Sequence, residues 1–311
     1  MRMLHPKLAS RCLVLCTASL YGCGLGAGPA PSAVQLTVTR DFGAHVLHRS
    51  GSLKLRGQET VMSVLRRNYT VTTRYGGGFV QSIDGLAGGQ ESSRPLDWFY
   101  YDNGIQAQEG AAATNVSRGD HIWWDRHDWS QTNDVPAVVG SFPEPFLNGI
   151  AGKRYPVRVE CEQISGTACA AARAELRSLG VPAAAAGLGQ GTEPKSLRLI
   201  VGVWSRIGYA LGAQSIARGP RASGVYAQFS PDGRTLTPLD QDGHQLRSLG
   251  AATGLIAATR QTEDAPIWVL TGTDAAGVDL AAHAFNEATL RDRFAVIVSG
   301  AGSLALPEAA P

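Results

Sequence analysis

Apolar and polar residues alternate along the first part of the chain that looks folded, and such alternation is typical of half-buried strands. Residues 34–42 (VQLTVTRDF) alternate in this way, and residues 52–56 form a second, shorter segment of the same kind. Between Glu59 and Asn68 the apolar residues recur instead on one face of a helix, with Thr60 as its cap. The pattern predicts two strands followed by one short helix.

Further strands, separated by glycine turns, follow this helix. Their residues are rich in β-branched and aromatic side chains, and they cover 70–74, 79–83, 97–101 and 121–125. Gly76, Gly77 and Gly78 lie before a strand, whereas a phosphate-binding loop follows a strand and opens a helix, so a hinge is the favoured interpretation. The region 34–130 is therefore expected to be an α+β domain with one mixed sheet on one helix.

Residues 131–150 contain three prolines between Val135 and Pro145 and are predicted to be a linker. Val138, Val139 and Phe142 make this linker too apolar for a free tether, so we expect it to pack on the second domain.

From residue 151 to residue 300 the pattern changes to alternating strands and helices, which predicts an α/β domain. Strands are expected at 157–161, 197–204, 225–229, 267–270 and 294–298, and helices at 169–179, 245–259 and 275–290. A strand, a glycine turn, a helix and a strand follow one another around Gly202 and again around Gly272, which suggests an internal repeat. Two copies of so common a unit can also arise by chance. Residues 301–311 are expected to be a tail.

The first 22 residues have the features of a secretory signal: a basic start followed by a short apolar run. Leu20-Tyr21-Gly22-Cys23 resembles the bacterial lipobox, in which the cysteine becomes the lipidated first residue. Residues 23–33 are rich in glycine, proline and alanine, as in a flexible tether. We therefore expect a lipid anchor on Cys23 at the outer face of a bacterial membrane; an ordinary cleaved signal is the alternative.

Charge and cysteine content narrow the partners. The 311 residues carry 28 basic and 26 acidic side chains, and removal of residues 1–22 takes away three basic ones and leaves 25 against 26. No basic field remains, so nucleic acid is not an expected partner. With Cys23 acylated, Cys161 and Cys169 are an even pair in an oxidising compartment and are expected to form a disulfide, with two buried free thiols as the alternative.

Aromatic residues are concentrated in the two segments 97–101 and 121–125. In the first segment, strand alternation places Trp98 and Tyr100 on one face and Phe99 and Tyr101 on the other. In the second segment, Ile122 and Trp124 share one face and Trp123 lies on the other. One face must be core. The other predicts either a stacking surface for a planar ligand or an interface with the second domain, and Phe99, Tyr101 and Trp123 are the candidate ligand-binding residues.

Two other groups have side chains suited to chemistry. His121, Asp125 and His127 are metal ligands by type, but their spacing along a strand spreads them over roughly 20 Å, so no metal site is predicted. Trp204 and Asp274 follow apolar strands, where ligands gather in α/β folds, although Asp274 as a plain helix cap is favoured. No catalytic motif accompanies them, and we expect no enzyme activity and no cofactor.

The residues GGGFVQSIDG (76–85), DWFYYDNG (97–104) and GDHIWW (119–124) resemble, in this order, the transcobalamin carboxy-terminal-like family of β-grasp domains, which is also seen in bacterial lipoproteins. In the animal vitamin carriers this kind of domain caps one face of cobalamin. The resemblance covers about residues 34–130 and implies a β-grasp module that binds a ligand, with a corrinoid such as cobalamin as one candidate.

These features together predict a lipid-anchored surface receptor that captures a small, partly planar ligand and delivers it to a membrane transporter. Two alternatives stay open: an adhesion or assembly module of the cell envelope, in which the aromatic residues are buried between domains, and an enzyme with a site near residues 271–274.

Overall fold

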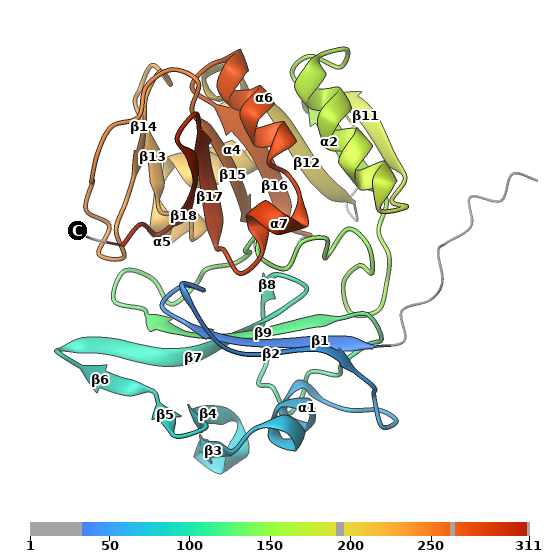
Figure 1. Ribbon diagram of the computed structural model, residues 1–311, viewed down its shortest axis with the longest axis vertical. Coiled ribbons are helices and arrows are strands. Elements are labelled where there is room, and N and C mark those ends of the chain that lie inside the picture. The colour runs from blue at the N-terminus through green and yellow to red at the C-terminus, as the bar shows by residue number, and fades with distance from the viewer. Residues whose placement is uncertain (1–32, 191–195, 262–264, 310–311) are drawn as a thin grey trace, which may run out of the picture.

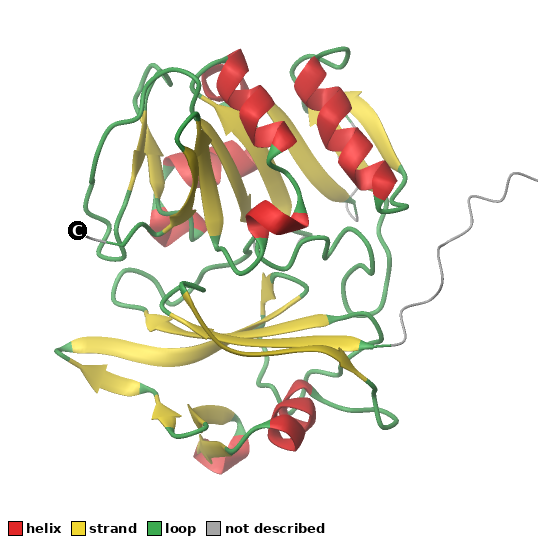
Figure 2. Cartoon of the chain, in the orientation of Figure 1, coloured by secondary structure: helices red, strands yellow, loops and turns green. Residues whose placement is uncertain are grey.

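The computed structural model describes residues 33–190, 196–261 and 265–309, and the expected signal, Cys23 and the expected tether up to residue 32 lie outside them. Two sheet-containing units lie one above the other (Figure 1). Strands predominate in the N-terminal unit, whereas helices flank the sheet of the C-terminal unit (Figure 2). The expected α+β class is confirmed. In the part of the chain that is described, no helix is both long and apolar enough to span a bilayer.

The N-terminal unit is built on a six-stranded sheet with the strand order β2-β1-β9-β7-β6, and β8 pairs with β7. These strands are β1 (Val34–Arg40), β2 (His45–Leu53), β6 (Gly89–Glu91), β7 (Arg94–Asp102), β8 (Ile105–Gln106) and β9 (His121–Asp128). β1 and β9 are parallel neighbours, and β7 pairs with β9 in the antiparallel sense. A smaller sheet contains β3 (Val71–Arg74), β4 (Phe79–Ile83) and β5 (Leu86–Ala87), with the 3-10 turn η1 (Tyr75–Gly77) between β3 and β4.

The predicted helix is confirmed as α1 (Val61–Asn68). Thr60 and Ser63 form a reciprocal capping box, in which each side chain accepts a backbone N–H of the other residue. The buried residues of α1 pack on the face of the sheet that carries Trp98, Tyr100 and Trp124. This face is the core of the N-terminal unit, as the alternation of the strands required.

A seven-stranded sheet with the order β11-β10-β12-β16-β15-β17-β18 forms the C-terminal unit. Its strands are β10 (Val157–Cys161), β11 (Ala183–Gly187), β12 (Leu197–Val203), β15 (Gly254–Thr259), β16 (Ile267–Gly272), β17 (Ala295–Ser299) and β18 (Gly302–Leu306). The first four in this spatial order run parallel. The helices are α2 (Thr167–Ser178), α3 (Trp204–Ile207), α4 (Leu211–Ala217), α5 (Pro220–Ser223), α6 (Ala275–His283) and α7 (Glu287–Leu290).

Two predicted helices of this unit need correction. Residues 254–259 form the buried strand β15 between β16 and β17 instead of the end of a helix, because all six residues are enclosed within the sheet. The helix expected at 275–290 is interrupted after His283, and Asn286 starts α7 by accepting the N–H of Thr289.

The expected internal repeat and tail are also not what the structure shows. β17 joins the main sheet, but β13 (Ala227–Phe229) pairs with β14 (Leu236–Pro238) in a separate two-stranded ribbon, so the two segments are not equivalent. β18 pairs with β17 along its whole length, so the sheet continues beyond residue 300. Edge pairing of this kind has no local sequence signal.

The segment 131–150 packs firmly, as its apolar residues predicted. Val138 donates to the carbonyl of Gly104 in the N-terminal unit, and Val139 donates to the carbonyl of Phe294 in the C-terminal unit. Phe142 and Phe146 contact the rings of Trp268 and Phe285. The segment therefore joins the two units through their cores.

Candidate functional site

Tyr101 and Trp123 lie in the core between the two units and have 0% exposed surface. Both rings meet Phe294 edge-on, at centroid distances of 5.5 Å and 5.3 Å. Gly140 of the linker passes so close that an added Cβ would lie 2.7 Å from the Trp123 ring. Of the two interpretations that the sequence left open for this face, the structure shows the domain interface, and a ligand has no access to either ring.

The other three predicted site residues also have structural partners. The ring of Phe99 stacks on His127 at 4.5 Å, and the indole of Trp204 stacks on Phe229 at 4.1 Å. Asp274 accepts the N–H of Gly277 at 2.8 Å, as a helix cap does, and the N–H of Ala252 at 2.9 Å. The five residues do not converge on one cavity.

His121, Asp125 and His127 are divided between two separate contacts. Asp125 accepts the N–H groups of Phe42 and Gly43 at 3.0 Å and 2.9 Å and lies 2.8 Å from Nδ1 of His127. His121 pairs with the Thr37 hydroxyl at 2.9 Å, and its burial lowers its pKa to about 4. These side chains organise the buried polar part of the interface.

A pocket of about 250 Å³ lies on the α1 side of the N-terminal sheet, beside β4 and β7. Its lining includes five aromatic residues: Phe79, Trp98, Phe99, Tyr100 and Trp124. Phe99 borders it even though its ring stacks on His127 on the other face. The segment 106–111 supplies the opposite wall, and Gln108 and Glu109 are exposed there. We call this the aromatic pocket.

Two of the three polar groups on Trp98, Tyr100 and Trp124 have hydrogen-bond partners. Trp98 donates its indole N–H to the carbonyl of Leu86 at 3.1 Å, and the Tyr100 hydroxyl donates to the carbonyl of Glu109 at 2.7 Å. The indole Nε1 of Trp124 is buried and has no hydrogen-bond partner among the described residues. An unpaired buried donor is costly, and an acceptor brought by a ligand would relieve that cost once the side chains that enclose this nitrogen shift.

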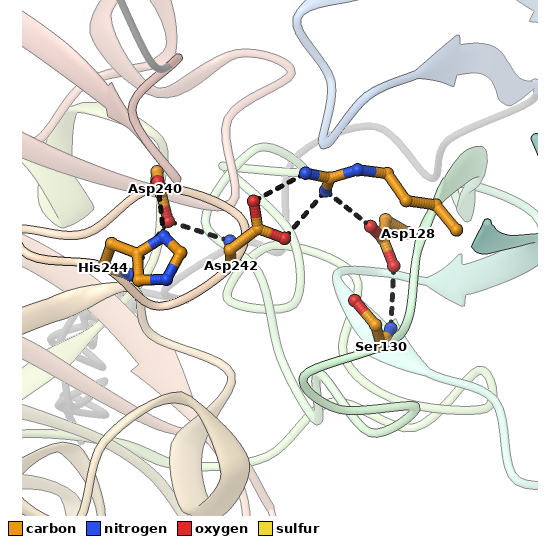
Figure 3. A network of polar contacts seen from close by, with 6 residues as sticks. Asp128, Ser130, Asp240, Asp242 and His244 are labelled. Carbon is orange, nitrogen blue, oxygen red and sulfur yellow. Dashed lines mark hydrogen bonds and ion pairs between the residues drawn. The ribbon is translucent and has the colours of Figure 1, made fainter. Parts of the chain in front are cut away.

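A second cavity, of about 670 Å³, opens between the two units. Arg94 of β7 lines it and donates twice to Asp242, at 2.8 Å and 2.6 Å, and once to Asp128, at 2.8 Å. Figure 3 shows Asp128 with Ser130 on one side of this contact and Asp242 with Asp240 and His244 on the other. The bidentate geometry is the strong form of a carboxylate–guanidinium pair, so Arg94 links the two units by an ion pair.

Asp240, Asp242 and His244 carry ligand atoms within 4.8 Å of one another, a cluster that sequence reasoning did not single out. The Asp240 carboxylate already accepts the N–H groups of Asp242 and His244, both at 2.9 Å, and Asp242 is held by Arg94. A cation here would have to displace the guanidinium. The arrangement is therefore that of a turn and an interdomain ion pair.

The carboxyl ends of β10 and β12 border a smaller cavity of about 70 Å³. The expected disulfide is confirmed: Cys161 and Cys169 are bonded, and Cys169 lines this cavity. Glu162 lines it too, but its carboxylate accepts the N–H of Val203 at 2.8 Å and pairs with Arg206. Trp204 and Asp274 follow and precede lining residues without lining the cavity themselves.

Residues 58–128 match the model of a family described as a domain of unknown function (DUF4430), which is known in the transcobalamin-like group. The matched segment contains α1, β7 and β9 and therefore the whole aromatic pocket. A search of curated proteins found no match.

Among solved structures, the chain is similar to one from Ruminococcus gnavus described as a "putative metal binding protein". The two share 17% sequence identity over 31% of this chain and 97% of the other, with a TM-score of 0.26. A likeness this distant carries no argument about the function of this chain.

Proposed function

We propose that the protein binds a small, partly planar ligand in the aromatic pocket while a lipid on Cys23 holds it at the outer face of a bacterial membrane, from where it passes the ligand to a membrane transporter. The observation that carries the binding role is a pocket whose lining includes five aromatic residues, one of which, Trp124, has a buried indole N–H without a partner among the described residues. Ligand sites combine apolar walls with a few polar groups in this way. The pocket belongs to the segment that matches a family of the transcobalamin-like group, which supports the same assignment.

The N-terminal unit is proposed to be a β-grasp domain of this group. The parallel pairing of β1 and β9 in the sheet, with α1 packed on one face, supports the proposal. The pocket's 250 Å³ equals the volume of about eight water molecules at roughly 30 Å³ each. A corrinoid such as cobalamin is much larger than this, so it would lie against the rim, and the pocket itself suits a smaller molecule.

Native mass spectrometry of the protein purified from its own host, followed by titration with cobalamin and with small flat molecules, tests the binding role. We expect a co-purified small molecule or a change of tryptophan fluorescence on titration. Trp124→Phe should weaken binding by about 1 kcal/mol, the worth of one hydrogen bond. The matched control, Trp129→Phe, removes a partly exposed indole outside the pocket and should leave affinity unchanged. No bound molecule together with no fluorescence response contradicts the proposal.

The anchor is tested separately, by feeding labelled fatty acid to the host. Label should reach the wild-type protein and be absent from Cys23→Ser, which should also be released or left unprocessed. A wild-type protein that never acquires label contradicts the lipoprotein assignment and leaves the binding role untouched.

A second candidate function is an adhesion or assembly module of the cell envelope. The complete burial of Tyr101 and Trp123 against the C-terminal unit favours it, because these aromatics stabilise a domain interface. Enzyme activity near residues 271–274 ranks third, since Asp274 is committed to two backbone N–H groups.

A further inference from the structure

The aromatic pocket has an electrostatic character that narrows its ligand. Among the described residues that line it, Glu109 is the one that carries a charge. The rings of Trp98, Tyr100 and Trp124 come from adjacent strands, and those of Tyr100 and Trp124 lie 4.9 Å apart. Aromatic faces carry negative electrostatic potential, so rings and carboxylate act in the same direction.

The pKa of Tyr100 is shifted in part by nearby carboxylates. Burial raises the pKa of Tyr100 to about 12, and the carboxylates of Asp102 and Glu109 add to that rise because they disfavour a second negative charge beside them. Among the lining residues, the Glu109 carboxylate would repel an anionic ligand and attract a cation.

Building on the proposed function, we propose that the pocket takes a small, flat organic cation that also bears a hydrogen-bond acceptor. The cationic ring stacks among the aromatic side chains within reach of Glu109. After a shift of the side chains that enclose it, the Trp124 N–H, which lacks a partner among the described residues, donates to this acceptor. Such a molecule of about ten non-hydrogen atoms suits the 250 Å³ volume.

A pair of matched probes tests the charge. The 1-methylnicotinamide cation is flat and carries an amide acceptor, and 3-methylbenzamide is its neutral counterpart with the same shape and the same amide. Calorimetric titration of the full chain should show the cation binding roughly tenfold more tightly than the neutral probe. N-methylpyridinium lacks the amide, so the wild type should bind it more weakly than 1-methylnicotinamide. Trp124→Phe should bind these two cations with equal affinity.

Glu109→Gln should lower affinity for the cation by about threefold and leave the neutral probe unaffected. Because Glu109 is exposed, this variant should keep the fold, which its circular dichroism and melting temperature check. Glu91→Gln is the matched control: it removes a carboxylate that is 67% exposed and lies outside the pocket.

Equal affinity for the two amides, or a preference for the neutral one, overturns the cation assignment while the proposed binding role stands. Binding of neither amide also overturns it, and the native mass experiment then judges the proposed function by itself. A loss in Glu91→Gln equal to that in Glu109→Gln would show a general charge effect and would likewise overturn the assignment.

Discussion

At the scale of single residues, the hydroxyl and the ring of a buried tyrosine at the interface contribute differently to the stability of the fold. The Tyr101 hydroxyl is buried without a partner among the described residues, and so is that of Tyr226. Burial raises the pKa of both phenols, because a charged phenolate would be poorly solvated there. The rings, in contrast, fill the core between the two units.

Tyr101→Phe should therefore leave the free energy of unfolding unchanged or raise it by up to about 1 kcal/mol, since it removes an unpaired polar group and keeps the ring. Trp123→Ala should lower it by about 3–5 kcal/mol, because it empties a fully buried site and removes the N–H that binds Thr39. Denaturant unfolding measures both. A destabilised Tyr101→Phe would mean that its hydroxyl has a partner, such as an ordered water.

At the scale of elements, the disulfide fixes the connection from β10 into the first turn of α2. Cys161 ends the strand and Cys169 lies on the buried side of the helix, eight residues later in the sequence. The bond closes a short loop, so the entropy it removes from the unfolded chain is modest.

Replacement of both cysteines by serine should lower the free energy of unfolding by about 2–3 kcal/mol, the value expected for closure of a loop of this length. Intact mass after alkylation, with and without reductant, checks the bond first. Two alkylatable thiols in the untreated protein would contradict it. Equal stability of the variant and the oxidised wild type would show that packing alone holds the loop.

At the scale of the whole molecule, two buried groups near the junction of the units titrate in opposite senses. Burial raises the pKa of Glu144 from 4.5 to about 7, with a contribution from Asp120. Burial lowers the pKa of His121 from 6.5 to about 4. Between pH 4.5 and pH 7 Glu144 binds a proton in the folded state but not in the unfolded state. Its contribution to the free energy of unfolding therefore falls as the pH rises through this range. Between pH 4 and pH 6.5 His121 binds a proton in the unfolded state but not in the folded state. Its contribution to the free energy of unfolding therefore grows as the pH rises through this range.

The two contributions to the free energy of unfolding are each about 3 kcal/mol and change with pH in opposite directions. Glu144→Gln removes the contribution that decreases with pH. The free energy of unfolding of this variant relative to wild type should therefore increase steadily from pH 5 to pH 7. Unfolding curves at several pH values measure the difference. Glu91→Gln, at an exposed position, should show no such trend. A constant difference for Glu144→Gln would place its folded-state pKa near the ordinary value.

Local pattern by itself determined much of this protein. It predicted α1 and its Thr60 cap, the strands that became β7 and β9, the disulfide, and the face on which each aromatic residue lies, because alternation, capping and cysteine pairing depend on neighbours in the sequence. It failed at β15, β18 and the ribbon of β13 with β14, where pairing with distant strands decides the structure.

Only the tertiary structure decided which aromatic face a ligand can reach. The sequence assigned Tyr101 and Trp123 to a ligand and left their burial against a second domain open. Phe294, which lies 193 positions after Tyr101 and 171 after Trp123, packs against both rings. The face assigned to the core keeps the pocket with the unpaired Trp124 N–H, because α1 and the small sheet do not cover it completely. Alternation tells which side chains share a face. What covers that face depends on contacts between segments far apart in the chain, which no local pattern records.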